Sequence, residues 1–299
     1  MAFKLAQILP RFRGRNGWGV HDWSGAALLV LISVWITADA WSDIMHRAMT
    51  DEESSHAMLV PLVAGWLLWV RLGRFRHCKP GPTWIGPAIV AIGAALYVAG
   101  DTYLVELFWH GGALLVAVGC CLTMLGRDVL RNFLPVFISL AFILPIPARV
   151  RQGVAIPLQR TTAQATQEVC RLAGLSVDRS GNILQLNGVD VAIGEACNGM
   201  RMTFALLLVC FAFALTAPLH GYVRVIIIVL SPLSAVLCNV VRLVPTVWVF
   251  GNCSLTTAEM FHDVSGWVML FVAFLLLMGI VRLLRWAMLP VTPFTLAYD

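Results

Sequence analysis

The residues best suited to covalent chemistry lie in segment 195–201, EACNGMR, which leads directly into a long apolar run. Asn198 and Gly199 suit the start of a helix better than its interior, so we expect Cys197 at the first turn of a helix. Free backbone N–H groups and the helix dipole favour a thiolate there, and Arg201 is a candidate cation with the same effect. Because the thiolate is the nucleophilic form, Cys197 is a candidate nucleophile. The alternative is that Cys197, one of eight cysteines, is a small buried apolar residue.

Three further polar residues lie within or beside the later apolar runs. Asn239 and Arg242 are three residues apart, so they share one face of a helix. A charge inside a membrane span is costly and marks a functional site by default, although an arginine near the end of a span can also extend to the interface. His262 lies in the expected outer loop, residues 251–266, that leads into the last apolar run.

A thiol, an imidazole and a guanidinium can together carry out acyl transfer. The thiolate attacks an amide carbonyl, the imidazole transfers protons, and the guanidinium stabilises the oxyanion together with helix N–H groups. Arginine stays protonated, so the base has to be the histidine. The sequence therefore predicts a cysteine acyl-transfer site made of Cys197, Arg242 and His262.

Other polar residues expected near the same membrane surface are candidates for binding a substrate. We assign this role to Arg201, Asn239, His56 and Glu53. For Glu53 and His56 the alternative is a solvated acidic loop whose serine caps the next helix. His56, His110 and His262 lack the close spacing of metal ligands, and no nucleotide or cofactor motif is present, so we expect neither a metal nor a cofactor.

The composition is that of an integral membrane protein. Hydrophobic residues make up 59% of the chain and charged residues 12%, and the mean hydropathy is +0.82. A span needs about 20 mainly apolar residues. Eight runs approach that length and are expected to be transmembrane helices: 24–41, 57–71, 84–100, 107–126, 132–147, 201–218, 222–250 and 266–286.

The basic residues predict the orientation of these spans. With the N-terminus in the cytoplasm, the inner segments hold thirteen of the 21 lysines and arginines, as the positive-inside rule requires. Both termini are then cytoplasmic, and Cys197 lies on the extracytoplasmic side of the plasma membrane, the inner membrane of a two-membrane cell. The net charge of +5 follows from this topology and needs no nucleic-acid partner.

The fold class expected is an all-α polytopic membrane protein with a small extracytoplasmic amphipathic helix and β-hairpin. Alternation on either side of Asn187-Gly188 predicts the hairpin, and helical spacing over 149–175 predicts the amphipathic helix. The segments, in order, are a basic cytoplasmic lead (1–23), five spans (24–147), the amphipathic helix and hairpin (148–196), three spans that carry the site (197–286) and a cytoplasmic tail (287–299).

Several of these motifs, taken in order, resemble the exosortase/archaeosortase family of membrane cysteine transpeptidases. The matching segments are Ser55-His56 with Leu59-Val60-Pro61, Leu144-Pro145-Ile146-Pro147, Leu158-Gln159, Gly181 with the hairpin, EACNGMR, Asn239-Val240-Val241-Arg242 and His262. Asn198 departs from the pattern, because the family usually has serine after the cysteine. That serine is not the nucleophile, so the departure affects the subtype and not the chemistry.

The resemblance implies that Cys197, Arg242 and His262 are catalytic. The substrates would be exported proteins with a C-terminal sorting tail: a short motif, often Pro-Glu-Pro-like, then a transmembrane helix and a basic end. The enzyme would cleave near the motif and transfer the acyl group to a lipid or glycan acceptor. Arg242 would hold either the oxyanion or a carboxylate of the motif.

Three alternative functions remain, and only the first keeps the same catalytic residues. The first is plain hydrolysis at the same site. The second is a non-catalytic transporter or polysaccharide-export component, in which Arg242 lines a path. The third is a redox role in which Cys197 pairs with Cys170 or Cys253, although no C-x-x-C pair is present.

Overall fold

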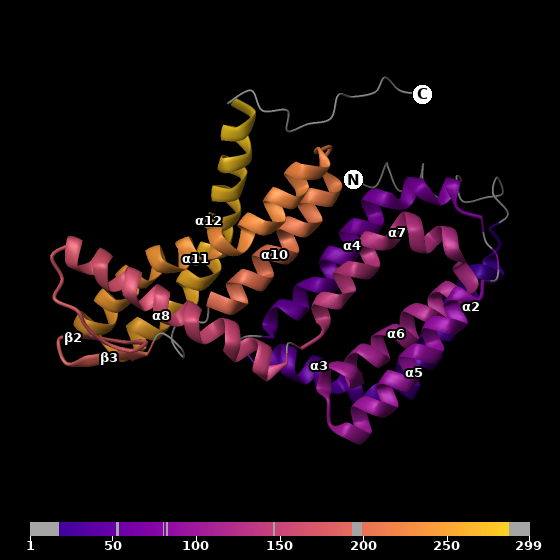
Figure 1. Ribbon diagram of the computed structural model, residues 1–299, viewed down its shortest axis with the longest axis horizontal. Coiled ribbons are helices and arrows are strands. Elements are labelled where there is room, and N and C mark those ends of the chain that lie inside the picture. Colours follow the sequence, from indigo (N-terminus) through magenta and orange to yellow (C-terminus); the bar gives the residue numbers. More distant parts are fainter. Residues whose placement is uncertain are drawn as a thin grey trace. The chain divides into compact units, whose positions relative to one another are not determined.

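The computed structural model describes residues 18–51, 54–79, 81, 83–145, 147–192 and 199–286. These residues form mainly α-helices and one small sheet (Figure 1). The chain divides into two compact units, Met1–Pro147 and Ala148–Asp299, and each is described by itself.

Four of the described helical segments are long and apolar enough to cross a membrane: Ser55–His77, Ile85–Tyr103, Glu106–Leu125 and Gly221–Asn252. A bent pair, Val20–Ile36 with Ala38–Thr50, would make a fifth span. The chain is therefore a multi-pass membrane protein. The eight spans expected from the sequence are not all confirmed. The helix in the fifth run covers only Arg127–Leu140, and the helices in the sixth and eighth runs, Gly199–Thr216 and Leu255–Trp286, contain residues whose side chains lie outside the description.

The N-terminal unit consists of α-helices and short 3-10 segments. They are α2 (Val20–Ile36), α3 (Ala38–Thr50), η2 (Ser55–Leu59), α4 (Val60–Arg71), η3 (Leu72–His77), α5 (Ile85–Tyr103), α6 (Glu106–Leu125), α7 (Arg127–Leu140) and η4 (Ala141–Ile143).

A sharp bend at Thr37 separates α2 from α3, which meet at 78°. The hydroxyl of Thr37 donates to the carbonyl of Ser33 (2.8 Å) and accepts from the indole N–H of Trp41 (3.0 Å), so the bend satisfies its own polar groups. The expectation that the first transmembrane helix ends at residue 41 was wrong, because the chain bends at Thr37 and continues as a helix to Thr50.

Helices α5 and α6 run side by side and approach each other closely through glycines (Figure 1). A Cβ built on Gly112 would lie 2.4 Å from the backbone nitrogen of Tyr97, so only glycine fits there. The glycines recur every seven residues, at 86, 93 and 100 on α5 and at 112 and 119 on α6. This spacing returns to one helix face and lets two backbones pack tightly in a membrane.

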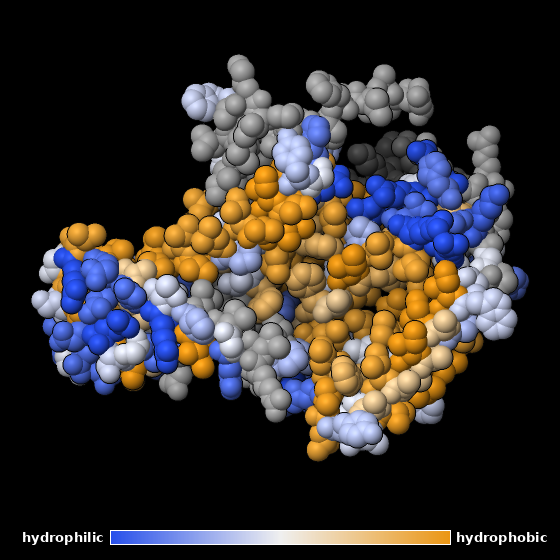
Figure 2. Space-filling model, in the orientation of Figure 1, coloured by the Kyte–Doolittle hydropathy of each residue, from blue (hydrophilic) through white to orange (hydrophobic). Residues whose placement is uncertain are grey.

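The C-terminal unit contains the sheet and the longest helices. They are α8 (Ala148–Leu172), β1 (Asp178–Ser180), β2 (Ile183–Leu186), β3 (Val189–Ala192), α10 (Gly199–Thr216), α11 (Gly221–Asn252) and α12 (Leu255–Trp286). Figure 2 shows hydrophilic side chains gathered over α8 and the strands, whereas the coloured surface over α10 and α11 is mainly hydrophobic.

The sheet is antiparallel with strand order β1-β2-β3. Asn187 and Gly188 connect β2 to β3 with positive φ angles of 54° and 80°, the backbone of a tight two-residue hairpin turn. One face of the sheet is buried against α8 and α11. The core on that face contains Ala163, Cys170, Val177, Leu184, Leu186, Val191, Leu243 and Val247.

Helix α11 is continuous over Gly221–Asn252 although it contains Pro232 and Pro245. The two prolines therefore do not break the helix expected over residues 222–250. A proline removes the N–H that would bond to the carbonyl four residues earlier. For Pro232 that carbonyl is the one of Ile228, and it accepts a hydrogen bond of 2.9 Å from the hydroxyl of Ser231 instead.

Helix α12 begins at Leu255, eleven positions before the expected start at residue 266. The Ser254 hydroxyl accepts from the backbone N–H of Thr257 at 3.4 Å, and the Ser254 carbonyl accepts from that of Ala258 at 3.0 Å. Serine is a favoured N-cap residue, which explains the early start. Consequently His262 lies within a helix and not in the expected loop.

Candidate active site

Helix α11 positions two of the predicted site residues inside the protein. Asn239 and Arg242 are each only 4% exposed. The Oδ1 atom of Asn239 and the Nε atom of Arg242 are both buried without a hydrogen-bond partner among the described residues. Next to Arg242 on the helix, Leu243 packs into the core formed with α8 and the sheet. A guanidinium and an amide are thus held in place by apolar packing while retaining hydrogen-bonding capacity.

Helix α12 positions the third described residue, His262. Its side chain is 11% exposed, and its Nδ1 lies 3.4 Å from Oδ1 of Asp263. Its carbonyl accepts a hydrogen bond of 2.9 Å from the hydroxyl of Ser265. A carboxylate beside Nδ1 favours the tautomer that carries a proton on this nitrogen, which leaves Nε2 as the basic atom. Helices α11 and α12 pack against each other, so imidazole and guanidinium are carried by neighbouring elements.

The remaining predicted site residues are distributed as follows. Cys197 and Glu53 lie outside the described residues. Arg201 belongs to the first turns of α10, and its side chain also lies outside the description. His56 is buried in η2 of the N-terminal unit, where η2 contacts α3, α4 and η4. The structure therefore describes Asn239, Arg242 and His262 together in one unit and His56 in the other.

Thr166 is a polar residue of the C-terminal unit that the sequence analysis missed. It lies on α8, which packs against α11, and its hydroxyl is buried with no hydrogen-bond partner in the described ranges. The available signal was its place among Ala163 and Cys170, which lie on the buried face of the amphipathic helix. Thr166 is therefore a buried hydroxyl on a helix that packs against α11.

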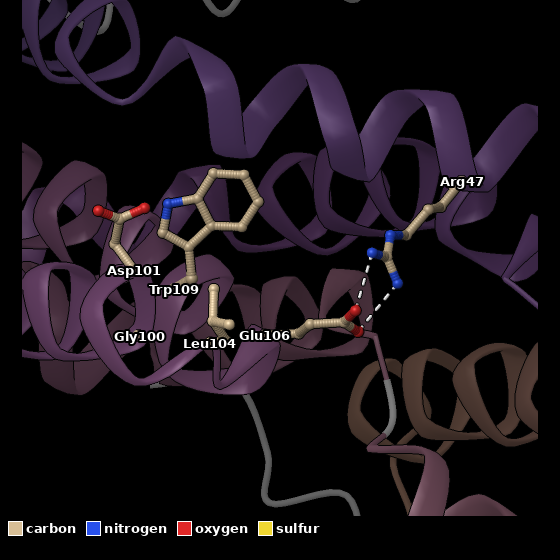
Figure 3. A pocket seen from close by; sticks show the side chains of 6 residues that line it. All are labelled: Arg47, Gly100, Asp101, Leu104, Glu106 and Trp109. Carbon is tan, nitrogen blue, oxygen red and sulfur yellow. Dashed lines mark hydrogen bonds and ion pairs between the residues drawn. The ribbon is translucent and has the colours of Figure 1, made fainter.

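The N-terminal unit holds a second group of polar residues, which the sequence analysis did not connect. Arg47 on α3 forms two hydrogen bonds of 2.9 Å to the carboxylate of Glu106 on α6, in a fork arrangement (Figure 3). The Nε of Arg47 also donates to Asp43 at 2.7 Å, and the same carboxylate oxygen lies 2.9 Å from Nε2 of His110. The i,i+4 spacing of Asp43 with Arg47 was the signal in the sequence.

A pocket of about 290 Å³ opens beside this group (Figure 3). Its lining residues are Arg47, Gly100, Asp101, Leu104, Glu106 and Trp109. These lining residues include none of the residues predicted for the cysteine acyl-transfer site. In the wall of the pocket, the guanidinium of Arg47 and the carboxylate of Glu106 neutralise each other. This pair therefore adds no net charge to the pocket.

The described cysteines are free thiols, including buried Cys170 and exposed Cys253. Burial raises the pKa of the Cys170 thiol above its ordinary value. This residue consequently carries little thiolate at neutral pH and is a poor nucleophile. Within the described ranges, no three His, Cys, Asp or Glu side chains are grouped so that they could hold a metal ion.

The family described as transmembrane exosortase matches residues 41–279, which include every residue predicted for the site. No curated protein and no solved structure matches the chain. The match covers well over half of the sequence, and the chain therefore belongs to the transmembrane exosortase family.

Proposed function

We propose that this protein is a membrane cysteine transpeptidase that processes exported proteins. In this proposal Cys197 is the nucleophile, His262 is the general acid and base, and Arg242 holds the oxyanion or a substrate carboxylate. The observation that carries the proposal is the burial of Arg242 with its Nε unpartnered among the described residues, since a buried guanidinium needs a partner that a substrate would supply.

The reaction has two steps. The Cys197 thiolate attacks the scissile carbonyl, the C–N bond breaks, and protonated His262 gives its proton to the leaving amine, so a thioester forms on the enzyme. An acceptor nucleophile then loses its proton to His262 and attacks the thioester, the C–S bond breaks, and the product is released with the Cys197 thiolate and protonated His262 restored. Arg242 stabilises the negative oxygen of both tetrahedral states.

The proposed substrates are exported proteins with a C-terminal sorting tail, and the proposed acceptor is a lipid or a glycan of the cell envelope. The proposed location is the plasma membrane, with both termini in the cytoplasm and the site on the extracytoplasmic side. Family membership and the excess of basic residues in the expected inner segments support this arrangement.

The test is the processing of a tailed exported protein from the same genome, co-expressed with the wild-type enzyme or with Cys197→Ala. We expect cleavage with the wild type and none with the variant at equal membrane levels. The intact mass of the product then separates transfer, which adds the acceptor's mass, from hydrolysis. Unchanged cleavage by Cys197→Ala would overturn the mechanism. If the Cys197→Ala variant still exported a polysaccharide or solute as the wild type does, that result would favour the transporter alternative.

A further inference from the structure

Strand β3 is an edge strand of the sheet. Strand β2 pairs with it on one side, and the part of the chain that the structure describes places no strand on the other side. Apart from its pairing with β2, the backbone of Val189–Ala192 makes no hydrogen bond to other described backbone groups. One side of β3 is therefore a row of N–H and C=O groups available to another extended chain.

The register identifies which groups these are. In a two-residue hairpin the residues that flank the turn exchange both of their hydrogen bonds, and every second pair does the same. Leu186 faces Val189, and Leu184 faces Val191. Val189 and Val191 thus direct their N–H and C=O groups toward β2. Asp190 and Ala192 direct theirs away from the sheet.

The strand is held firmly although its edge is open. Val191 is 2% exposed and belongs to the core with α8 and α11. On the other face, the side chain of Asp190 accepts a hydrogen bond of 2.7 Å from Gln185 on β2. Asn187 in the turn donates to the carbonyl of Gly251 at the end of α11 (3.2 Å). The edge is thus preformed, which lowers the entropic cost of adding a strand.

The two edges of the sheet differ in their protection against pairing. Strand β1 is three residues long, and two of them, Asp178 and Arg179, are charged. Strand β3 is four residues long and contains neither proline nor lysine, the residues that most often block an exposed edge. Its single charge, on Asp190, is bound to Gln185. The composition of β3 therefore suits an edge that receives a partner.

The position of β3 in the chain indicates which partner. Ala192 precedes Cys197 by five residues, which span at most about 18 Å when extended. An added strand lies about 4.8 Å from its neighbour. A polypeptide bound along β3 would consequently lie beside a strand that leads within five residues of the chain to the proposed nucleophile, and it would be in the extended form in which its carbonyls are accessible to attack.

We propose that an extended stretch of the polypeptide substrate binds to the free edge of β3 as a fourth strand and is thereby aligned with Cys197. This proposal rests on the function proposed above and names the surface that recognises the substrate. Main-chain hydrogen bonds form with peptides of many different sequences. This surface therefore aligns the substrate, while other residues supply sequence specificity.

The first test removes single outward N–H groups with proline. In the full-length enzyme, Ala192→Pro and Asp190→Pro each delete an N–H that β2 does not use, and proline is tolerated at such edge positions. Loss of one hydrogen bond is expected to lower kcat/KM for a tailed exported protein by about fivefold to tenfold, through KM. The matched controls Ala192→Val and Asp190→Ala keep the N–H, so each is expected to process the substrate faster than the proline variant at the same position.

The second test measures the pairing directly and does not depend on turnover. In a Cys197→Ala background, Ala192→Cys or Asp190→Cys is combined with single cysteines along the substrate segment that precedes the tail helix. Directly opposed residues of paired strands have Cβ atoms about 5 Å apart and form disulfides under mild oxidation. We expect the substrate position that reacts with residue 190 to differ by two from the one that reacts with residue 192.

The outcomes separate this proposal from the proposed function. Strand addition would be overturned if neither proline variant slowed cleavage and no disulfide pattern of period two appeared. If cleavage still required Cys197, the proposed function would stand. Disulfides formed only between two copies of the enzyme would also overturn it. Cleavage that persists in Cys197→Ala would overturn the proposed function itself, whatever the proline variants show. A folding defect in the proline variants would leave the decision to the disulfide pattern.

Discussion

The side chains of Asp43 and His110 join α3 to α6 through a hydrogen bond of 2.9 Å, although the two residues are 67 positions apart in the chain. His110 has no exposed surface, and Oδ2 of Asp43, the atom that it contacts, also accepts from Arg47 at 2.7 Å. This carboxylate therefore satisfies a buried imidazole and orients a guanidinium at once.

Removing this carboxylate should destabilise the N-terminal unit. Asp43→Ala leaves Nε2 of buried His110 without its partner, which costs about 1–3 kcal/mol. The expected result is a lower Tm of the purified protein in detergent. Glu168→Ala, which breaks the exposed Arg171–Glu168 pair, is the control and should leave Tm nearly unchanged. Equal Tm values for the two variants would contradict the structural role of Asp43.

The close approach of α5 and α6 should not tolerate a methyl group. Gly112→Ala places a Cβ against the backbone of Tyr97, and overpacking of this kind typically costs about 1–3 kcal/mol. Gly65→Ala on α4 is the matched control, because no atom lies within 4 Å of the added Cβ. Thermal unfolding of the two variants should show a lower Tm for Gly112→Ala alone. Similar Tm values would mean that the helices separate at little cost.

Arg242 should be needed as a guanidinium and not merely as a positive charge. Lysine lacks the planar fork of donors, so Arg242→Lys is expected to slow cleavage of a tailed exported protein by about 100-fold or more, as for the loss of an oxyanion donor. The measurement is the initial rate in membranes, normalised to enzyme level. Arg282→Lys on the exposed surface of α12 is the control. A wild-type rate for Arg242→Lys would remove Arg242 from the site.

The thiols of Cys170 and Cys253 should differ in reactivity. Cys253 is exposed, whereas Cys170 is buried and its thiol pKa is raised, so less Cys170 thiolate is present at any given pH. We expect a maleimide to label Cys253 quickly at pH 7.5. Labelling of Cys170 should be far slower and should increase only at higher pH. Mass spectrometry of tryptic peptides measures both rates, and fast labelling of Cys170 at pH 7.5 would show that the sheet and α11 do not cover it.

The membrane class and the family were predictable from the sequence because both depend on local patterns. Apolar runs of sufficient length predict spans, and most of the expected run boundaries lie within a few residues of observed helix ends. The three-residue spacing of Asn239 and Arg242 predicts a common helix face, and both side chains are buried on α11. These features depend on helical geometry alone, which a few neighbouring residues determine.

Local patterns were less informative where capping and bending decide the outcome. The sequence analysis placed His262 in a loop, because the apolar signal of the last run begins only after it. In the structure Ser254 caps a helix that starts earlier with polar residues. Likewise, Thr37 and Trp41 stabilise a bend inside a continuous apolar run, which no hydropathy pattern reveals.

The amino-acid sequence by itself determined that this chain is a multi-pass membrane protein of the transmembrane exosortase family, because length, apolarity and short motifs are properties of contiguous residues. Only the tertiary structure decided that Asp43 meets His110, that Thr166 is buried on a helix that packs against α11, and that β3 is an edge strand of the sheet formed by the described residues. Such relationships join residues far apart in the chain. They depend on how helices and strands pack, and that packing is the sum of many weak contacts that no single segment encodes.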